Sequence, residues 1–235
     1  MNIAGSGVVP EGEYGEKISV AGSAAFSGNV KCPEIRSSGS LKAKGDVDCT
    51  GSVETAGSFS SAGSVRAGKI IKTAGSAKID GDLKCETLRS AGSIHIGGEI
   101  EAENVFVGGA VRCSGLMNAE NVEIRFSDDS HAGSIGGGTI KIIKENEGKE
   151  GNIIINILFV KVTKETHSSA SSAVFTVDEA IEGDTVAVEY VRAPLVSGRV
   201  VAIGAGCVID TVRYHDQIEI SPDAKVGRTE KEEST

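Results

Sequence analysis

The feature that most restricts the fold of this chain is a glycine that returns at a nearly constant spacing, followed by serine in six of seven cases. It occupies the same position in seven successive segments, at Gly5, Gly22, Gly39, Gly57, Gly75, Gly92 and Gly109. One segment thus takes about 17–18 residues, and a fixed period of this kind is typical of a solenoid, in which each repeat is one unit stacked on its neighbours.

Alignment of the segments on this glycine produces columns of similar residues. One apolar column lies two residues after a second recurring glycine and consists of Val30, Val47, Val65, Leu83, Ile100 and Met117. Another lies two residues after the first glycine and consists of Ala24, Leu41, Phe59, Ala77, Ile94 and Val111. Apolar residues two apart in short segments indicate strands with one inward face. Glycine supplies the sharp corners between such strands.

These columns predict an all-β fold, a right-handed parallel β-helix (solenoid) with three short strands in each coil of about 17–18 residues. Coils of this kind stack ~4.8 Å apart, so that identical positions lie above one another. Each inward Val or Ile contributes roughly 1.5–3 kcal/mol when it is fully buried. We favour the right-handed form because parallel crossovers have this hand in about 98 % of cases.

The repeat also predicts the organisation of the chain. Residues 1–144 form β-helix coils, residues 145–172 form an insertion, and residues 173–226 continue the same β-helix. The continuation depends on the same spacing, which relates Val186, Ile203 and Ile220 and also relates Leu195 and Val212. Residues 227–235 are charged and are predicted to form a disordered polar tail.

Charge and cysteine content restrict the partners and the compartment. The formal net charge is −9, with acidic and basic residues interspersed. This balance argues against a nucleic-acid groove, which needs a basic field, and against electrostatic binding to anionic lipid. Five cysteines without a recognisable secretion signal predict a reducing, cytoplasmic setting.

Several short motifs follow one another in an order that is more specific than any one of them. They are Gly5-Ser6-Gly7-Val8-Val9-Pro10, Ile18-Ser19-Val20-Ala21-Gly22-Ser23, the Gly-Asp/Asn-Val/Leu-Lys/Asp-Cys unit at Gly28, Gly45 and Gly81, Gly115-Leu116-Met117-Asn118-Ala119-Glu120, and Ile203-Gly204-Ala205-Gly206-Cys207-Val208-Ile209. In this succession the chain resembles the bactofilins, bacterial polymer-forming cytoskeletal proteins, in a longer form typical of Firmicutes. The resemblance covers nearly the whole chain apart from the insertion and the tail.

The resemblance implies a structural protein that polymerises end to end without nucleotide and has no enzymatic activity. Its partners would be further copies of itself or a paralogous bactofilin. Its role would be to support cell shape or to localise envelope proteins, in the cytoplasm at the inner face of the cell membrane.

The two ends of a β-helix explain physically why such a protein would assemble. The first and last coils expose unpaired backbone groups, which native proteins usually cover. The sequence predicts no capping helix at the N-terminal coil and only polar residues after the last apolar strand. The predicted contact residues are Val8, Val9, Ile18 and Val20 at one end and Ile218, Ile220 and Val226 at the other.

The apolar segment of residues 153–160 within the insertion has two interpretations. It is either a strand packed along the flank of the solenoid or an element that docks a partner or a membrane, since exposed apolar patches mark contacts. The residues predicted for docking are Ile154, Ile157, Leu158 and Phe159.

The histidines and cysteines suggest an alternative of a different class, a β-helix enzyme of the acyltransferase or gamma-carbonic-anhydrase type. The four histidines are His95, His131, His167 and His215. The separation of His95 and His131 along the chain fits two coils, but no motif places a carboxylate beside them. Three cysteines, Cys32, Cys49 and Cys85, share an inward column with alanines, where a thiol behaves as a small apolar group. We therefore predict no catalytic residue, no metal and no cofactor. A capped binding module that complexes with a paralogue is a third interpretation.

Overall fold

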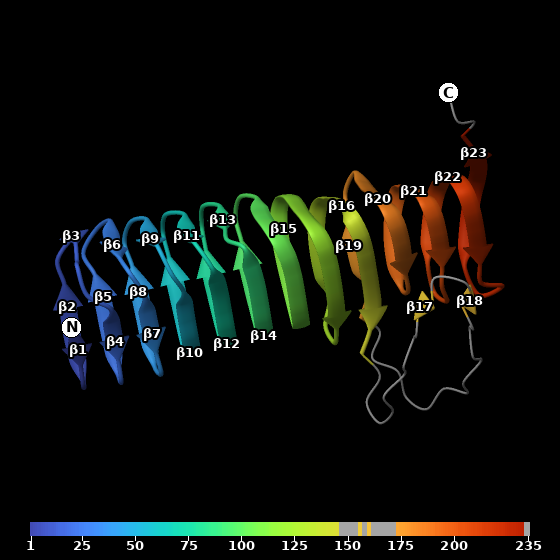
Figure 1. Ribbon diagram of the computed structural model, residues 1–235. Helices are drawn as coiled ribbons and strands as arrows, with labels where there is room; N and C mark the ends of the chain where they lie inside the picture. The colour runs from blue at the N-terminus through green and yellow to red at the C-terminus, as the bar shows by residue number, and fades with distance from the viewer. Residues whose placement is uncertain (146–154, 157–158, 161–172, 233–235) are drawn as a thin grey trace.

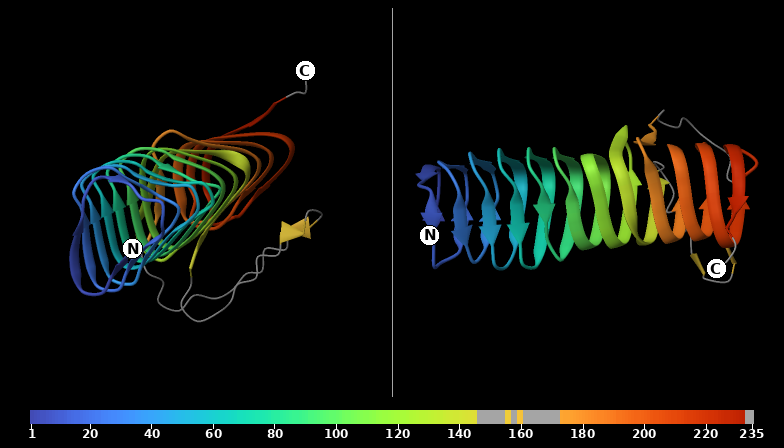
Figure 2. Two further views of the ribbon diagram at one scale, coloured as in Figure 1. Left: turned by 60° about the vertical axis from the view of Figure 1, so that its left-hand side comes forward. Right: turned by 90° about the horizontal axis from the view of Figure 1, so that it is seen from above.

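The structure is a computed structural model, and it describes residues 1–145, 155–156, 159–160 and 173–232 of the 235-residue chain. Within these residues, all regular secondary structure is β-strand. Twenty-one strands pair in parallel in one continuous sheet. They stack as a solenoid of about 12 turns roughly 17 residues apart, which runs along one axis from the N-terminus to β23 (Figures 1 and 2). The parallel β-solenoid predicted from the repeat is therefore confirmed.

The first three coils contain three short strands each, as the repeat predicts. Their bounds are β1 Asn2–Ile3, β2 Ser6–Val9, β3 Gly12–Glu13, β4 Ile18–Val20, β5 Ser23–Phe26, β6 Val30–Cys32, β7 Ile35–Ser37, β8 Ser40–Ala43 and β9 Val47–Cys49. From the fourth coil onward, strands run through the first glycine corner and merge. These strands are β10 Val53–Ser61, β11 Val65–Ala67, β12 Ile70–Ile79, β13 Leu83–Lys84, β14 Thr87–Ile96, β15 Ile100–Phe126 and β16 Ser130–Lys144.

The strand register reproduces the predicted columns. Val47 pairs with Val30 and with Val65, and Phe59 pairs with Leu41. All five side chains are buried in one hydrophobic core that extends along the axis. This register is the same for either hand of winding, so the right-handed form stays a prediction.

At the first corner of several coils the chain turns in a conformation that residues other than glycine rarely adopt. Gly57, Gly75, Gly92 and Gly109 have φ angles between 116° and 126°. A Cβ atom on Gly75 would also lie 2.4 Å from the carbonyl oxygen of Gly57 in the preceding coil. The column of glycines therefore allows both the turn and the close approach of successive coils.

The second corner is stabilised by a ladder of polar side chains that follow the second glycine. The Asp46 amide donates to Oδ1 of Asn29 over 2.8 Å, and the Ser64 amide donates to Oδ1 of Asp46 over the same distance. The Asp82 amide then donates to Oγ of Ser64 over 3.0 Å. Each side chain thus binds a backbone amide of the next coil that the turn leaves without a backbone partner.

The sheet continues across the insertion. Ser130 of β16 pairs with Phe175, and Ile140 pairs with Val186. The rings of Phe126 and Phe175 meet edge to face with centroids 5.8 Å apart, which continues the core across this junction. The strands that follow the insertion are β19 Phe175–Val177, β20 Ala180–Val188, β21 Val191–Ile203, β22 Val208–Ile220 and β23 Lys225–Lys231.

Two predictions for the C-terminal coils are wrong. Val186 pairs with Val201 and not with Ile203. Leu195 pairs with Thr211 and not with Val212. The coils directly after the insertion are shorter than the repeat that precedes it, so a fixed spacing shifts their columns. Ile203 and Ile220 do pair, as predicted.

The prediction of a disordered tail over residues 227–235 is wrong for residues 227–231. These residues belong to β23, which pairs in parallel with β22. Arg213 and Glu230 form an ion pair across this pairing, with 3.0 Å between Nε and Oε2. Strand pairing uses backbone groups and needs no apolar side chain, so polar residues suffice where the edge of β22 is available. Residues 233–235 lie outside the described part of the chain.

Candidate self-assembly surfaces at the two ends

The C-terminal end leaves half of a coil uncovered. Strand β22 pairs with β21 through Ile220, but β23 covers only its first half, up to Tyr214. Ile218 and Ile220 lie in the uncovered half, where they pair with Val201 and Ile203. These two partners are 1 % and 2 % exposed, whereas Ile220 is 39 % exposed and Ile218 is only partly buried. Core positions are therefore exposed at this end of the described chain, in which no further coil covers them.

The backbone of this segment also faces the open side. The Ser221 amide donates to the carbonyl of Ile203 over 2.8 Å, so this amide is directed at the preceding coil. Successive residues of a strand direct their amide and carbonyl groups to opposite edges, so those of Ile218 and Ile220 point away from the solenoid. Val226 of β23 stacks on Ile209 and is partly buried. We call Ile218, Ile220 and Val226 the C-terminal layer.

The N-terminal end is more closed. Val9 is 1 % exposed, although no coil precedes it in the described chain. Tyr14 of the same coil packs against the core, and its hydroxyl donates to the carbonyl of Pro10 over 2.7 Å. The ring therefore spans the first coil from residue 14 toward residue 10. The terminal amine is tied down as well, since it donates to the carbonyl of Lys17 over 2.8 Å.

Burial corrects the predicted N-terminal contacts. Ile18 and Val20 belong to the second coil and are core residues, 0 % and 3 % exposed, and Val9 is equally buried. None of these three side chains is accessible to another molecule in this conformation. Val8 is 71 % exposed, but it pairs with Ala25 in an outward column and so faces the flank, not the end. The accessible candidates are those of the C-terminal layer.

The predicted docking residues of the insertion lie mostly outside the described residues. Ile154, Ile157 and Leu158 belong to this undescribed part. Phe159 is described in its backbone only, as part of β18 (Phe159–Val160), which pairs antiparallel with β17 (Ile155–Asn156). The docking interpretation therefore stays a prediction.

Three histidines of the enzyme alternative, His95, His131 and His215, are partly exposed at the surface. Arg112 pairs with both His95 and His131, so these histidines share one outward column two coils apart, as their spacing suggests. His131 Nε2 lies 2.9 Å from Oδ2 of Asp178, and His215 forms a similar pair with Glu232. Over the described residues, no three His, Cys, Asp or Glu side chains gather in a way that would hold a metal ion. His167 is not among these residues.

The cysteines are free thiols in the core. The sulfur atoms of Cys32 and Cys49 lie 3.5 Å apart in neighbouring coils. The hydrogen bond with Cys32, together with burial, raises the pKa of the Cys49 thiol. Burial raises the pKa of Cys85 to about 12 and the pKa values of Cys113 and Cys207 to about 11. These three thiols are therefore protonated at neutral pH and poor nucleophiles.

Comparison of the chain with protein-family models, with curated proteins and with solved structures finds no match. Among the described residues, no helix combines the length and the apolar character that a membrane span requires.

Proposed function

We propose that this protein is a structural subunit that assembles end to end, without nucleotide, into a cytoskeletal or scaffold polymer. The observation that supports the proposal is the C-terminal layer, which presents core side chains and unpaired backbone groups at the end of a rigid rod. Such an edge pairs readily with another strand. The resemblance to bactofilins points the same way, and from it alone comes the proposal that the polymer supports cell shape or envelope proteins at the membrane.

The columns of the solenoid make such stacking geometrically simple. Ile220 stands at the end of the inward column that begins with Ile3, and Val226 at the end of the column that begins with Val9. A further coil placed on the C-terminal layer therefore meets apolar residues at the positions where the core would continue. That coil can be the first or the last coil of another copy, and the proposal does not depend on which.

The contacts that such stacking would form are strong enough to offset the free-energy cost of association. Completing the burial of a half-exposed Ile contributes roughly 1 kcal/mol, about half of what full burial provides. Each new backbone hydrogen bond adds a net ~0.5–1.5 kcal/mol. Three apolar side chains and several backbone bonds thus offset an association cost of about 4 kcal/mol or more.

The proposal is tested by the double substitution Ile218→Glu and Ile220→Glu in the full chain. We expect the wild type to form filaments by negative-stain electron microscopy and the double variant to sediment as single rods, since charges at the edge oppose stacking. Val208→Glu is the matched control, because Val208 is 41 % exposed on the outer face of the same strand. Circular dichroism and thermal unfolding verify that all three proteins fold.

The control is expected to form filaments like those of the wild type. Filaments that persist unchanged in the double variant would show that the C-terminal layer is not the contact. A wild type that stays monomeric at every concentration would remove the case for a polymer.

A further inference from the structure

One outward column of the solenoid carries a basic residue in most coils. It begins with Val8 and Ala25, and the register then places at this position, coil after coil, Lys42, Ser60, Lys78, His95, Arg112, His131, Thr176, Arg192, Val208 and Lys225. The column contains no carboxylate, although the net charge of the chain is −9. We call it the basic column.

Other outward columns differ from it because they contain charges of both signs. One of them contains Lys31, Asp48 and Arg66, and another contains Arg36, Glu54 and Lys72. The excess of acidic residues is therefore spread over other parts of the rod. At physiological salt, charges more than about 8–10 Å from a ligand are largely screened. A ligand at the basic column therefore interacts mainly with the charges of that column.

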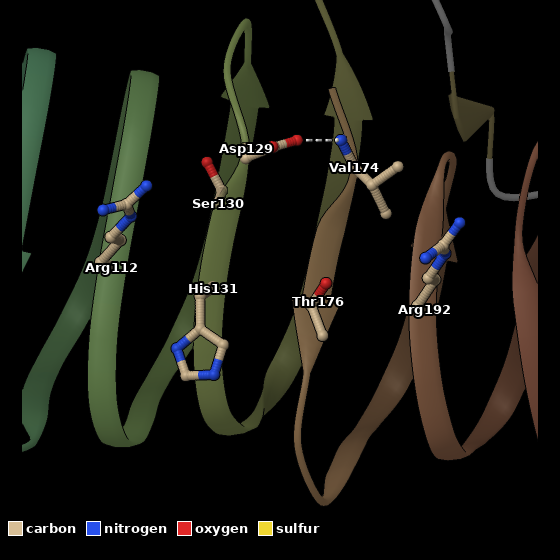
Figure 3. A pocket seen from close by; sticks show the side chains of 7 residues that line it. All are labelled: Arg112, Asp129, Ser130, His131, Val174, Thr176 and Arg192. Carbon is tan, nitrogen blue, oxygen red and sulfur yellow. Dashed lines mark hydrogen bonds between the residues drawn. The ribbon is translucent and has the colours of Figure 1, made fainter. Parts of the chain in front are cut away.

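A shallow pocket of about 470 Å³ opens on this column. Figure 3 shows Arg112, His131, Thr176 and Arg192 on four successive coils along it. Since coils are spaced ~4.8 Å apart, the backbones of the two arginines are separated by about 14 Å. The two arginines thus stand on either side of His131 and Thr176 along the column, and Figure 3 shows the His131 ring directed to the opposite side from the two guanidinium groups.

The charges that face the pocket leave the two guanidinium groups available. Oδ1 of Asp129 accepts a hydrogen bond from the Val174 amide over 3.0 Å (Figure 3), and Asp178 pairs with His131. The Asp178 carboxylate is therefore paired with an imidazole, whereas Asp129 keeps its negative charge and directs Oδ1 at the Val174 amide. Within the described part of the chain, neither Arg112 nor Arg192 forms an ion pair with a carboxylate.

We propose that the basic column at this pocket binds phosphoryl groups, one at the guanidinium group of Arg112 and one at that of Arg192. The planar guanidinium fork matches the oxygens of a phosphate and binds them in a bidentate manner. The Thr176 hydroxyl supplies a neutral donor between the two charges. No Phe, Tyr or Trp side chain is among the described residues that line the pocket, so it lacks the large aromatic ring on which a nucleobase usually stacks. The recognised chemistry is therefore the phosphoryl group itself, carried by a soluble anion or by a lipid headgroup.

This site is independent of the proposed polymer, because it lies on the flank and not in the C-terminal layer. Its test uses the full chain in two arms. Calorimetric titration with inorganic phosphate and with pyrophosphate measures the soluble ligand. Co-sedimentation with vesicles of phosphatidic acid in a neutral lipid, compared with neutral vesicles alone, measures the headgroup.

The variants are a double charge reversal, Arg112→Glu with Arg192→Glu, and the conservative Arg112→Lys. Arg66→Glu is the matched control, because Arg66 is an exposed arginine in a column of mixed charge. We expect the double reversal to weaken binding about tenfold or more, equivalent to about 1.4 kcal/mol. Arg112→Lys is expected to lose part of the affinity, since it keeps the charge but not the fork. The Arg66→Glu protein is expected to bind like the wild type.

Binding of phosphate or pyrophosphate alone identifies a soluble ligand, and binding of acidic vesicles that pyrophosphate displaces identifies a headgroup. Either result supports the site if the double reversal weakens the binding about tenfold or more. The proposal is overturned if the wild type binds neither ligand at millimolar concentration, or if the double reversal and the Arg66→Glu control bind equally well.

Discussion

Replacement of Gly75 by alanine tests the idea that the glycine column sets how closely the coils stack. Gly75 has a φ of 116°, and its added Cβ would lie 2.4 Å from the carbonyl oxygen of Gly57. Cβ atoms essentially never approach other atoms closer than 3.0 Å, so the two coils must move apart locally to admit the methyl group. The contact is with backbone, which no rotation of a side chain relieves.

The expected cost has two parts. A non-glycine residue in so unusual a conformation costs about 1–3 kcal/mol. Separation of the coils weakens the hydrogen bonds on either side of Gly75, each worth a net ~0.5–1.5 kcal/mol. We therefore expect Gly75→Ala to lower the free energy of unfolding by about 2–4 kcal/mol.

Substitutions at two glycines of the first coil distinguish the cost of the backbone conformation from the cost of the close contact. Gly5 has a φ of 129° but no atom within 4 Å of its added Cβ, because no coil precedes it in the described chain. Gly15 has neither a positive φ nor a neighbour within that distance. Gly5→Ala should therefore show the conformational cost alone, and Gly15→Ala should be neutral or slightly stabilising.

The measurement is urea unfolding followed by circular dichroism. Since solenoids do not always unfold in one step, the slopes and midpoints of the curves are compared together. The expected order of stability is Gly15→Ala, then Gly5→Ala, then Gly75→Ala. If Gly75→Ala proved as stable as Gly15→Ala, the close approach of glycine to the preceding carbonyl would have no energetic weight and the reasoning would fail.

The remaining predictions concern buried polar groups. Because the thiols of Cys113 and Cys207 have pKa values raised to about 11 from 9.0, the folded state keeps their protons when the unfolded state loses them. Their contribution to stability is therefore complete below pH 9 and lost between pH 9 and 11, and urea unfolding of the double alanine variant should depend less on pH over this range. Ser90→Ala removes the 3.0 Å hydrogen bond that Thr73 donates and should lower the free energy of unfolding by about 1 kcal/mol. Ser37→Ala should lower it less, since Oγ of Ser37 is buried without a partner in the structure. Equal shifts of the two melting temperatures would contradict this expectation.

The accuracy of the sequence predictions follows the regularity of the repeat. Before the insertion, a residue such as Val47 has its neighbours in register one repeat away on either side, so alignment of the segments predicts its contacts. After the insertion the coils shorten, and Val186 pairs with Val201 where the earlier spacing predicts Ile203. The number of residues in a coil depends on the length of each corner, and the spacing of apolar residues alone does not predict that length.

The predicted contact residues show the same limit. Alternation identified Val9, Ile18 and Val20 as apolar strand residues, but it did not show that all three are buried. Ile18 and Val20 lie in the second coil, which the first coil covers through the pairing of β1 with β4, and Tyr14 packs against the core within the first coil. At the other end, alternation correctly placed Ile220 on an inward column, and the edge above it is open because β23 pairs only with the first half of β22.

The phosphoryl site was missed, although part of its signal was present. Lys42, Lys78, His95 and Arg112 stand at the same position of the aligned segments. A net charge of −9 suggested no basic surface because an overall sum does not show how charges are distributed. Arg192 joins this column only through the register across the insertion, which no spacing in the sequence reveals.

By itself, the sequence determined the parallel solenoid, its glycine corners and the inward columns of its regular coils. These features are local and recur once per turn, so each repeat of the sequence contains the same signal. The tertiary structure alone decided the register after the insertion, which end of the rod is open, and which charged side chains share a face. Those properties arise at the insertion, at the ends of the rod and on its surface, where the repeat is interrupted or absent. There the contacts between residues distant in the sequence determine the structure, and the repeat does not predict them.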